Sequence, residues 1–228
     1  MYIINGILII DKPKGITSYD VIRNLKKDFP KGTKIGHAGI LDPFATGLLI
    51  VMVGREATKL MDKFHTLKKR YVVEAQLGFC TDTQDITGKI LRLSQVGNIP
   101  TLQSIQNVID ENFCGSILQT PPNYSAKKIG GRKAYELARE GQHIELKPKQ
   151  IEIYECKVRE YEYPKLILEI LCSTGTYVRT VVNDIGEKLG VYATSVELRR
   201  TNIGEFSVDD AGSSIISVDK VIESINHG

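Results

Sequence analysis

The sequence lacks any long apolar segment. The longest uninterrupted apolar run, Leu48 to Val53, is much shorter than the roughly 20 residues that a membrane-spanning helix requires. The amino terminus also lacks the basic start, apolar middle and small-residue cleavage site of a secretory signal. With 42% hydrophobic and 25% charged residues, the composition is that of a soluble globular protein. We therefore expect a cytoplasmic protein with no membrane partner.

Paired cysteines are missing as well. The four cysteines are far apart and form no Cys-x-x-Cys pair, which argues against a structural zinc site and against a disulfide framework. The histidines His65, His143 and His227 show no metal-ligand spacing with one another. We therefore expect no bound metal, and we interpret most of the cysteines as small buried apolar residues.

No internal repeat, low-complexity tract or flexible linker divides the sequence, so a single domain over residues 1–228 is the simplest interpretation. Apolar residues alternate from Tyr71 to Leu77, as in a half-buried strand, and recur at helical spacing from Val178 to Leu189. The segment Thr17 to Asp20 has the pattern of a helix capping box, and Thr101 can cap a later helix. Because strands and helices do not alternate regularly, the pattern predicts an α+β fold with a mixed, largely antiparallel sheet flanked by helices.

Basic residues gather in two blocks. Residues 1–70 carry 13 Lys and Arg against 6 Asp and Glu, and residues 121–150 carry 7 against 3. The rest of the chain is net acidic, with 10 against 18. Because the total net charge is only +3, charge alone favours two solvated faces over a nucleic-acid surface.

The most unusual segment is Gly36 to Gly47, where glycines, a proline, a histidine and Asp42 crowd together between regular elements. Pro43 disfavours a helical backbone at Asp42, and the glycines permit conformations that other residues avoid. We interpret residues 32–47 as a turn-rich stretch. Turns that contain Asp-Pro are common, so the residues by themselves favour a structural turn over a catalytic loop.

The same segment reads Gly-His-x-Gly-x-Leu-Asp-Pro-x-Ala-x-Gly and resembles the active-site motif of the TruB family of tRNA pseudouridine-55 synthases. Four further blocks are similar to the family and follow in the same order. They are Asp11 to Ser18, Lys69 to Tyr71, Pro122 to Lys127 and Gly175 to Thr180. The resemblance covers nearly the whole chain, and chance does not explain five blocks in one order.

The resemblance implies a cofactor-free isomerisation of uridine to pseudouridine at position 55, in the T loop of tRNA. The bond from ribose C1′ to N1 is broken, the uracil turns, and C1′ is joined to C5. Asp42 is then the catalytic carboxylate, which either attacks C1′ or removes a sugar proton. The target uridine is stacked inside a folded loop, so it has to be flipped out before the carboxylate can reach it.

The resemblance also implies roles for residues that look ordinary in the sequence. Arg179 is the charge partner of the catalytic carboxylate, Tyr71 stacks on the target base, and His37 helps to hold the rearranged RNA loop. Tyr177 and Leu198 line the uracil pocket. Without the resemblance, Arg179 would be a surface ion-pair residue, His37 a turn histidine, and the other three ordinary core residues.

The two basic blocks become expected phosphate contacts under the same resemblance. In the first block, these contacts come from the region of Lys12 and Lys14. In the second block, residues from about 121 to 147 resemble a mobile RNA-binding hairpin-helix insertion that closes over RNA, with the Gly130-Gly131 turn as its hinge. Its expected phosphate contacts are Lys127, Lys128, Arg132 and Lys133. Asp85 lies in a further family block and is expected to position the active loop.

Many members of the family carry a C-terminal RNA-binding domain of the PUA type, and we expect none here. The RNA footprint should then be smaller. We also expect a monomer, because the sequence shows no coiled coil or obvious partner helix. Three other functions stay open at this point: the same chemistry on another RNA, a non-catalytic tRNA-binding or tRNA-folding module, and carboxylate-assisted nucleoside hydrolysis.

Overall fold

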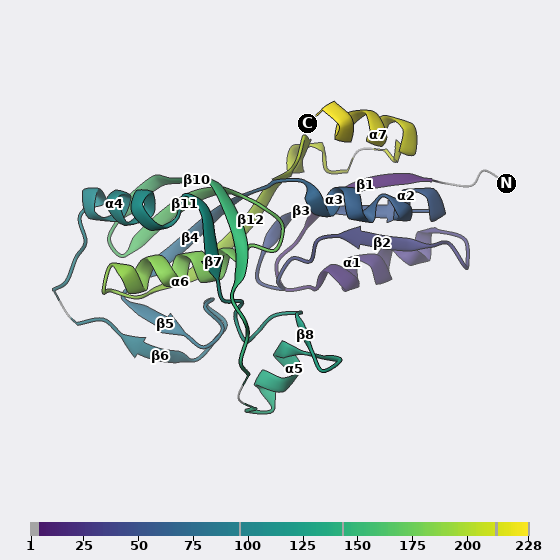
Figure 1. The fold of residues 1–228 in the computed structure, drawn as a ribbon. Helices are drawn as coiled ribbons and strands as arrows, with labels where there is room; N and C mark the ends of the chain where they lie inside the picture. The colour runs from purple at the N-terminus through teal and green to yellow at the C-terminus, as the bar shows by residue number, and fades with distance from the viewer. Residues whose placement is uncertain (1–4, 96, 143, 213, 228) are drawn as a thin grey trace. The chain divides into compact units, whose positions relative to one another are not determined.

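The computed structural model describes residues 5–95, 97–142, 144–212 and 214–227, and its fold is drawn in Figure 1. The chain divides into two compact units. The first unit combines residues 1–72 with residues 197–228, and the second consists of residues 73–196. The boundary between the units falls within two strands, β4 (Lys69–Leu77) and β12 (Ala193–Ile203).

The first unit contains the strand order β14-β1-β3-β12. Besides its parts of β4 and β12, its elements in chain order are β1 (Gly6–Lys12), α1 (Ser18–Leu25), the 3-10 helix η1 (Lys26–Asp28), β2 (Ile35–Ala38), β3 (Thr46–Val53), α2 (Arg55–Lys59), α3 (Met61–Thr66), β13 (Phe206–Ser207), the 3-10 helix η2 (Val208–Asp210), β14 (Ile216–Ser217) and α7 (Val218–His227).

Strand β3 lies at the centre of this unit. One edge pairs with β1, and the other edge pairs with β12 at its start and with β2 at its end. Its side chains alternate between two apolar clusters, one around Leu48, Ile50 and Met52 and the other around Leu49 and Val51. Burial of both faces therefore explains the continuous apolar run, which is typical of a central strand.

Helix α1 begins at the predicted capping box. The Thr17 hydroxyl accepts a hydrogen bond from the Asp20 amide at 3.1 Å, and the Asp20 carboxylate accepts from the Thr17 amide at 2.9 Å. Two details differ from the sequence-based expectation. Phe29 continues the helical spacing of Val21, Ile22 and Leu25 in the sequence, but the helix passes into η1 before it and Phe29 lies in extended backbone. The stretch expected to be turn-rich contains strand β2. Pairing with β3 stabilises β2, and such a long-range partner is invisible in local sequence.

The second unit contains the strand order β4-β11-β10-β7. Its further elements in chain order are β5 (Phe79–Thr81), β6 (Ile90–Leu93), α4 (Leu102–Asn112), β7 (Gly115–Gln119), β8 (Lys128–Ile129), β9 (Arg132–Lys133), α5 (Ala134–Arg139), β10 (Lys149–Glu162), β11 (Lys165–Cys172) and α6 (Val178–Lys188).

Helices α4 and α6 contact each other, and α4 also contacts β10. Thr101 caps α4 as predicted, by accepting a hydrogen bond from the Ser104 amide at 3.1 Å. In the sequence, Leu102 lies at helical spacing with Ile105 and Ile109, which predicts that it belongs to the apolar stripe of this helix, but the structure leaves it exposed. Three of the four cysteines in this unit are buried and Cys114 is exposed, so the expectation that most are buried is confirmed.

The predicted fold class is confirmed. Strand pairing is antiparallel for β1 with β3, β1 with β14, β2 with β3, β7 with β10 and β10 with β11, whereas β3 and β12 are parallel. This is a mixed, largely antiparallel sheet accompanied by helices. None of the helices in the described ranges is both long enough and apolar enough to cross a bilayer.

Candidate active site

Asp42 lies in the loop that joins β2 to β3 in the first unit. The residue before it is fixed by Ser18, whose hydroxyl accepts a hydrogen bond from the Leu41 amide at 2.9 Å. The residue after it is fixed by Gly15, whose amide donates to the carbonyl oxygen of Pro43 at 2.7 Å. Asp42 itself is half-buried. The loop is therefore held on both sides of Asp42, while Asp42 itself remains partly exposed.

Arg200 on β12 supports the same loop from inside the unit. This side chain is only 1% exposed. Its guanidinium donates to the carbonyl oxygen of Leu48 at 2.8 Å and to that of Gly39 at 3.1 Å, so it holds both ends of the segment that carries Asp42. Charged donors make the stronger class of protein hydrogen bond, which suits a structural anchor.

Gly47, the last glycine of the motif, lies directly against the backbone of Arg200. Its φ of 103° lies in the region that favours glycine, and a Cβ added there would come within 2.3 Å of the Arg200 carbonyl oxygen. Gly47 pairs with Arg200 on one side and with Lys12 on the other. The last glycine of the motif therefore has a steric reason, because β12 approaches too closely for any side chain.

Lys12 is fully buried, which contradicts its expected role as a phosphate contact. Its ammonium donates to the carbonyl oxygens of Pro13 and Ile16, both at 2.8 Å. The pKa of Lys12 is lowered from 10.5 to about 8, mainly because of burial; the Asp42 carboxylate opposes this shift, and Arg200 contributes to it. Sequence analysis missed this inward position because a lysine next to a surface turn normally points to solvent.

The other cations near this loop are paired on the surface of the unit. Lys14 forms an ion pair with Glu197 at 2.5 Å, and both side chains are about half exposed. Arg199 donates to both carboxylate oxygens of Asp11, at 3.0 and 2.7 Å. Lys14 is therefore accessible to a phosphate, as expected, but it would have to leave its acid partner.

His37 lies on β2 and is half-buried. Burial lowers the pKa of His37, and the nearby charges of Arg200 and His65 act in the same direction, so the neutral imidazole is favoured at pH 7. Its buried Nδ1 atom has no hydrogen-bond partner among the residues described. The structure therefore places His37 in a strand and not in the turn considered from sequence.

Tyr71 and Leu198 also belong to the first unit. Tyr71 lies on β4 with 9% of its surface exposed, and Leu198 lies on β12 with 5% exposed. In β4 the buried and partly exposed residues alternate, as the sequence pattern predicts. Their proposed contacts with a flipped base remain predictions.

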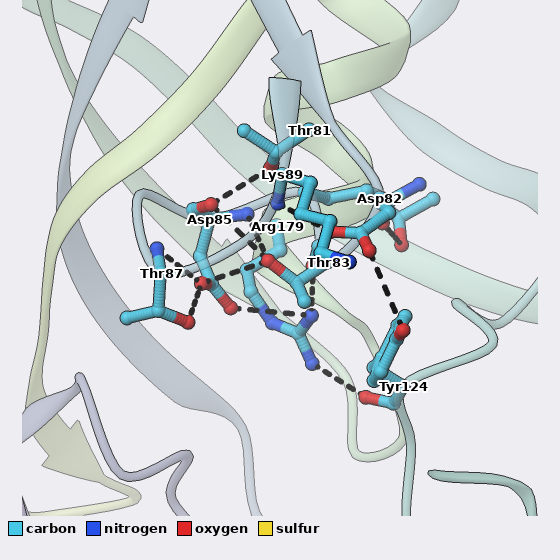
Figure 2. Close-up of polar contacts among 10 residues, drawn as sticks. Thr81, Asp82, Thr83, Asp85, Thr87, Lys89, Tyr124 and Arg179 are labelled. Carbon is cyan, nitrogen blue, oxygen red and sulfur yellow. Dashed lines mark hydrogen bonds and ion pairs between the residues drawn. The ribbon is translucent and has the colours of Figure 1, made fainter. Parts of the chain in front are cut away.

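Arg179 and Asp85 form a buried pair in the second unit (Figure 2). The Arg179 guanidinium lies 3.6 Å from the Asp85 carboxylate, and the two side chains are 3% and 8% exposed. Arg179 also donates to the carbonyl oxygen of Tyr124 at 3.0 Å and to that of Thr83. The pair is therefore not the surface ion pair that the sequence alone favoured.

Asp85 is itself held by a ring of threonine donors (Figure 2). Its Oδ1 accepts from the Thr83 hydroxyl at 2.9 Å, from the Thr87 amide at 2.9 Å and from the Thr87 hydroxyl at 2.5 Å. These hydrogen bonds fix the orientation of the carboxylate. Asp85 thus holds the Arg179 guanidinium in place, and its expected role in positioning the active loop stays a prediction.

Tyr177 is positioned by a residue that sequence analysis missed. The side-chain amide of Gln119 donates to the Tyr177 carbonyl oxygen at 3.0 Å and accepts from the Tyr177 amide at 2.8 Å. Gln119 is 3% exposed and ends strand β7. A glutamine at a strand end carries no sequence signal for such a clamp, because its partner lies 58 residues away.

The predicted insertion is a small hairpin followed by a helix. In Figure 1, β8 and α5 extend away from the sheet of the second unit. The turn at Gly130-Gly131 has positive φ at both glycines, 56° and 88°, as expected for a tight hairpin. Lys128, Arg132 and Lys133 are exposed, and Arg132 forms an ion pair with Glu140.

The structure thus brings the site residues together in two groups. In the first unit, Asp42 lies near Lys12, which also lies near Arg200. In the second unit, Arg179 lies with Asp85 and the Tyr124 backbone. Arg200 could have been suspected from sequence, because adjacent residues of a strand face opposite sides and one member of the Arg199-Arg200 pair must point inward.

Comparison with known proteins defines the class to which this architecture belongs. Residues 26–178 match the family model of the TruB family pseudouridylate synthase N-terminal domain, and residues 179–225 match that of the tRNA pseudouridylate synthase B C-terminal domain. The chain is therefore a pseudouridine synthase, which is an isomerase. It belongs to the TruB family, as the resemblance of its five blocks predicted.

Curated relatives agree with this assignment. The chain is 43% identical to tRNA pseudouridine synthase B of Protochlamydia amoebophila over 97% of its own length and 84% of the relative. It is 44% identical to the protein of that name from Caldicellulosiruptor saccharolyticus, over 96% and 74% of the two chains.

Solved structures show the same fold. One is described as the crystal structure of a Cbf5-Nop10-Gar1 complex, with a TM-score of 0.68 and 29% identity over 96% of this chain and 54% of that chain. Another is described as an H/ACA RNP bound to a substrate RNA containing 2′-deoxyuridine, with a TM-score of 0.64 and 27% identity over 96% and 52% of the two chains. This chain spans about half the length of each of these two solved chains.

Proposed function

We propose that this chain converts uridine 55 in the T loop of tRNA to pseudouridine, with Asp42 as the catalytic carboxylate. The observation that carries the proposal is the complete motif around Asp42, in a loop that Ser18 and Gly15 hold on both sides of this residue. The curated relatives are named tRNA pseudouridine synthases, which supports tRNA as the substrate class. The reaction needs no cofactor, because one bond to ribose C1′ is exchanged for another without any net oxidation or reduction.

The chemistry assigns Asp42 to the ribose of a flipped uridine. The C1′ to N1 bond breaks, the C1′ to C5 bond forms, C5 loses a proton and N1 gains one. A carboxylate suits this reaction because it can attack C1′ as a nucleophile or take a sugar proton as a base. These routes differ in a measurable way. A kinetic isotope effect with deuterium at ribose C2′ would identify proton removal, and its absence would favour attack at C1′.

The remaining site residues act on the base and on the RNA loop in this proposal. Tyr71 stacks on the uracil, Tyr177 and Leu198 line its pocket, and His37 helps to hold the RNA loop after base flipping. Burial of Tyr71 and Leu198 and the neutral state favoured for His37 are compatible with these roles. Arg179 serves as the charge partner of the catalytic carboxylate, with Asp85 keeping its guanidinium in place.

The test is incubation of the protein with an unmodified tRNA transcript, followed by carbodiimide probing and primer extension to map pseudouridine. We expect one product, at position 55. Asp42→Asn should bind the tRNA but form no detectable product, because it keeps the shape of the side chain and removes its charge. Asp62→Asn, an exposed change in α3, is the matched control and should keep full activity.

Other outcomes of this experiment identify the alternative functions. Product at another position, or on another RNA only, would show the same chemistry with a different substrate. Binding without product from the intact protein would indicate a non-catalytic tRNA-binding or tRNA-folding module, and release of free uracil would indicate hydrolysis. Equal product from the intact protein and Asp42→Asn would reject Asp42 as the catalyst.

A further inference from the structure

A cavity of about 310 Å³ lies in the second unit, where the insertion joins the sheet. Ile151 and Pro121 supply buried apolar surface, and Gly175 and Tyr177 contribute the segment that leads into α6. The remaining lining residues are Gln119, Ala126, Lys127 and Lys149. Each of these residues belongs to the second unit, so the cavity is complete without the loop that carries Asp42.

The two lysines that line this cavity come from opposite ends of the insertion. Lys127 lies near the start of the insertion, just before β8. Lys149 lies just after the end of the insertion and is the first residue of β10. Neither lysine has an acidic partner within ion-pair distance among the residues described. Other cations on this chain do have such partners, for example Lys14 with Glu197 and Arg132 with Glu140. Two unpaired positive charges that line one cavity attract an anion.

The start of α6 adds to this positive potential. Helix α6 has 11 residues, begins at Val178 and has no acidic residue in its first turn. Free amide groups at a helix start favour negative charge. The Lys149 ammonium lies beside this segment, since a Cβ built on Gly175 would be 3.4 Å from its Nζ. Gln119 holds the Tyr177 backbone by two hydrogen bonds, so this wall of the cavity is rigid.

We propose that this cavity binds one phosphodiester group of the RNA substrate, with its ribose against the apolar floor. This inference rests on the proposed function, because an RNA substrate supplies the phosphate. Bound between Lys127 and Lys149, the phosphate neutralises two like charges and links the start of the insertion to β10.

The first test is the salt dependence of tRNA binding, measured with the inactive Asp42→Asn protein so that no product forms. Each phosphate contact contributes about 0.7 to 0.9 to the slope of log affinity against log salt. Lys149→Gln should lower this slope by about that amount and weaken binding several-fold at low salt. Lys149→Arg should keep the slope. Lys157→Gln, an exposed change on the same strand at a lysine paired with Glu155, is the matched control and should leave the slope unchanged.

The second test locates the phosphate on the RNA. Neutral methylphosphonate linkages are placed one at a time across the T stem-loop. We expect one linkage to weaken binding by the Lys149 protein and to have no further effect on Lys149→Gln. If every linkage that weakens one protein weakens the other equally, the cavity does not bind a phosphate.

Pseudouridine formation by the intact protein, measured on the same RNA, separates the two proposals. A chain that forms pseudouridine but shows no linkage specific to Lys149 overturns the cavity inference alone. A chain that forms none overturns the proposed function, whatever the binding slopes show. Thermal melting of Lys149→Gln should match that of the unsubstituted protein, because Lys149 is exposed and makes no ion pair among the described residues.

Discussion

Each of the two units contains one buried arginine that supports its candidate site residues, and the two arginines do so in different ways. Arg200 in the first unit is 1% exposed and donates to the backbone carbonyl oxygens of Leu48 and Gly39. It has no carboxylate within ion-pair distance in the part of the chain that the structure describes. Arg179 in the second unit is 3% exposed and also donates to carbonyl oxygens, but it lies beside the Asp85 carboxylate.

The difference separates a backbone anchor from a side-chain network. Because the partners of Arg200 are backbone atoms, no single substitution of a partner side chain removes its contacts. Asp85, by contrast, depends on hydrogen bonds from Thr83 and Thr87 for its own position. A substitution of either threonine can therefore also displace the Arg179 side chain. We therefore expect Arg200 to govern the stability of the first unit, and Asp85 to govern the placement of Arg179.

The largest expected effect comes from removing the backbone anchor. Arg200→Met leaves two carbonyl oxygens without a charged donor and should lower the free energy of unfolding by about 4 kcal/mol. Arg199→Met, the neighbouring change on the same strand, removes only an exposed ion pair with Asp11 and should cost less than about 1 kcal/mol. Urea unfolding measures both. Equal losses would show that Arg200 is no anchor.

The second largest effect should come from a substitution on β3, the strand that pairs with β12 at Arg200. Gly47→Ala places a Cβ against the Arg200 backbone at a φ of 103°, and we expect a loss of about 3 kcal/mol. Gly130→Ala is the control, because Gly130 also has a positive φ but has nothing within 4 Å of an added Cβ. It should cost about 1 kcal/mol. A larger loss at Gly130 would contradict the steric argument.

A smaller effect should follow from weakening the side-chain network. Asp85→Asn keeps an oxygen for the threonine donors but removes the charge that faces Arg179, and we expect a loss of about 2 kcal/mol in the free energy of unfolding. If Arg179 acts in catalysis, kcat should fall more than tRNA affinity. Asp82→Asn, which changes a more exposed carboxylate in the same loop, should alter neither kcat nor affinity appreciably. Identical kinetics for Asp85→Asn and the unsubstituted protein would remove Asp85 from the network.

The smallest effect concerns the pH dependence of stability at Lys12. Burial is the main reason that its pKa is lowered from 10.5 to about 8 in the folded chain. The carboxylates of Asp42 and Asp20 oppose this shift, and Arg200 contributes to it. Between pH 8 and pH 10.5 the unfolded chain therefore binds more protons than the folded chain, so stability should rise with pH across this window. After allowance for screening by solvent, we expect a gain of about 1 to 2 kcal/mol.

Comparison with Lys12→Met isolates this contribution from the other groups that titrate between pH 8 and pH 10.5. Urea unfolding at pH 8 and pH 10 should show a smaller rise, or a steeper fall, for the variant than for the unsubstituted protein. The same pH dependence for both proteins would contradict the lowered pKa of Lys12.

Local patterns in the sequence predicted much of the fold. The capping box at Thr17, the alternation of β4 and the Gly130-Gly131 hairpin are each formed by neighbouring residues, so the sequence contains all the information that they need. Strand β2 was missed because its pairing partner β3 is separated from it along the chain. The exposed position of Leu102 was missed because helical spacing identifies an apolar face but not where that face ends.

For the site, the sequence by itself determined the family and led to the proposal of Asp42 as the catalytic carboxylate, because an ordered set of motifs can be read without knowledge of the three-dimensional packing. Only the tertiary structure decided which cations are buried supports and which are accessible. Lys12 and Lys14 are both lysines of one short basic segment, yet one is fully buried and the other forms a surface ion pair. The same holds for Arg199 and Arg200. Their roles differ because burial and charge partners are set by strand pairing, which brings together residues that lie 188 positions apart in the sequence.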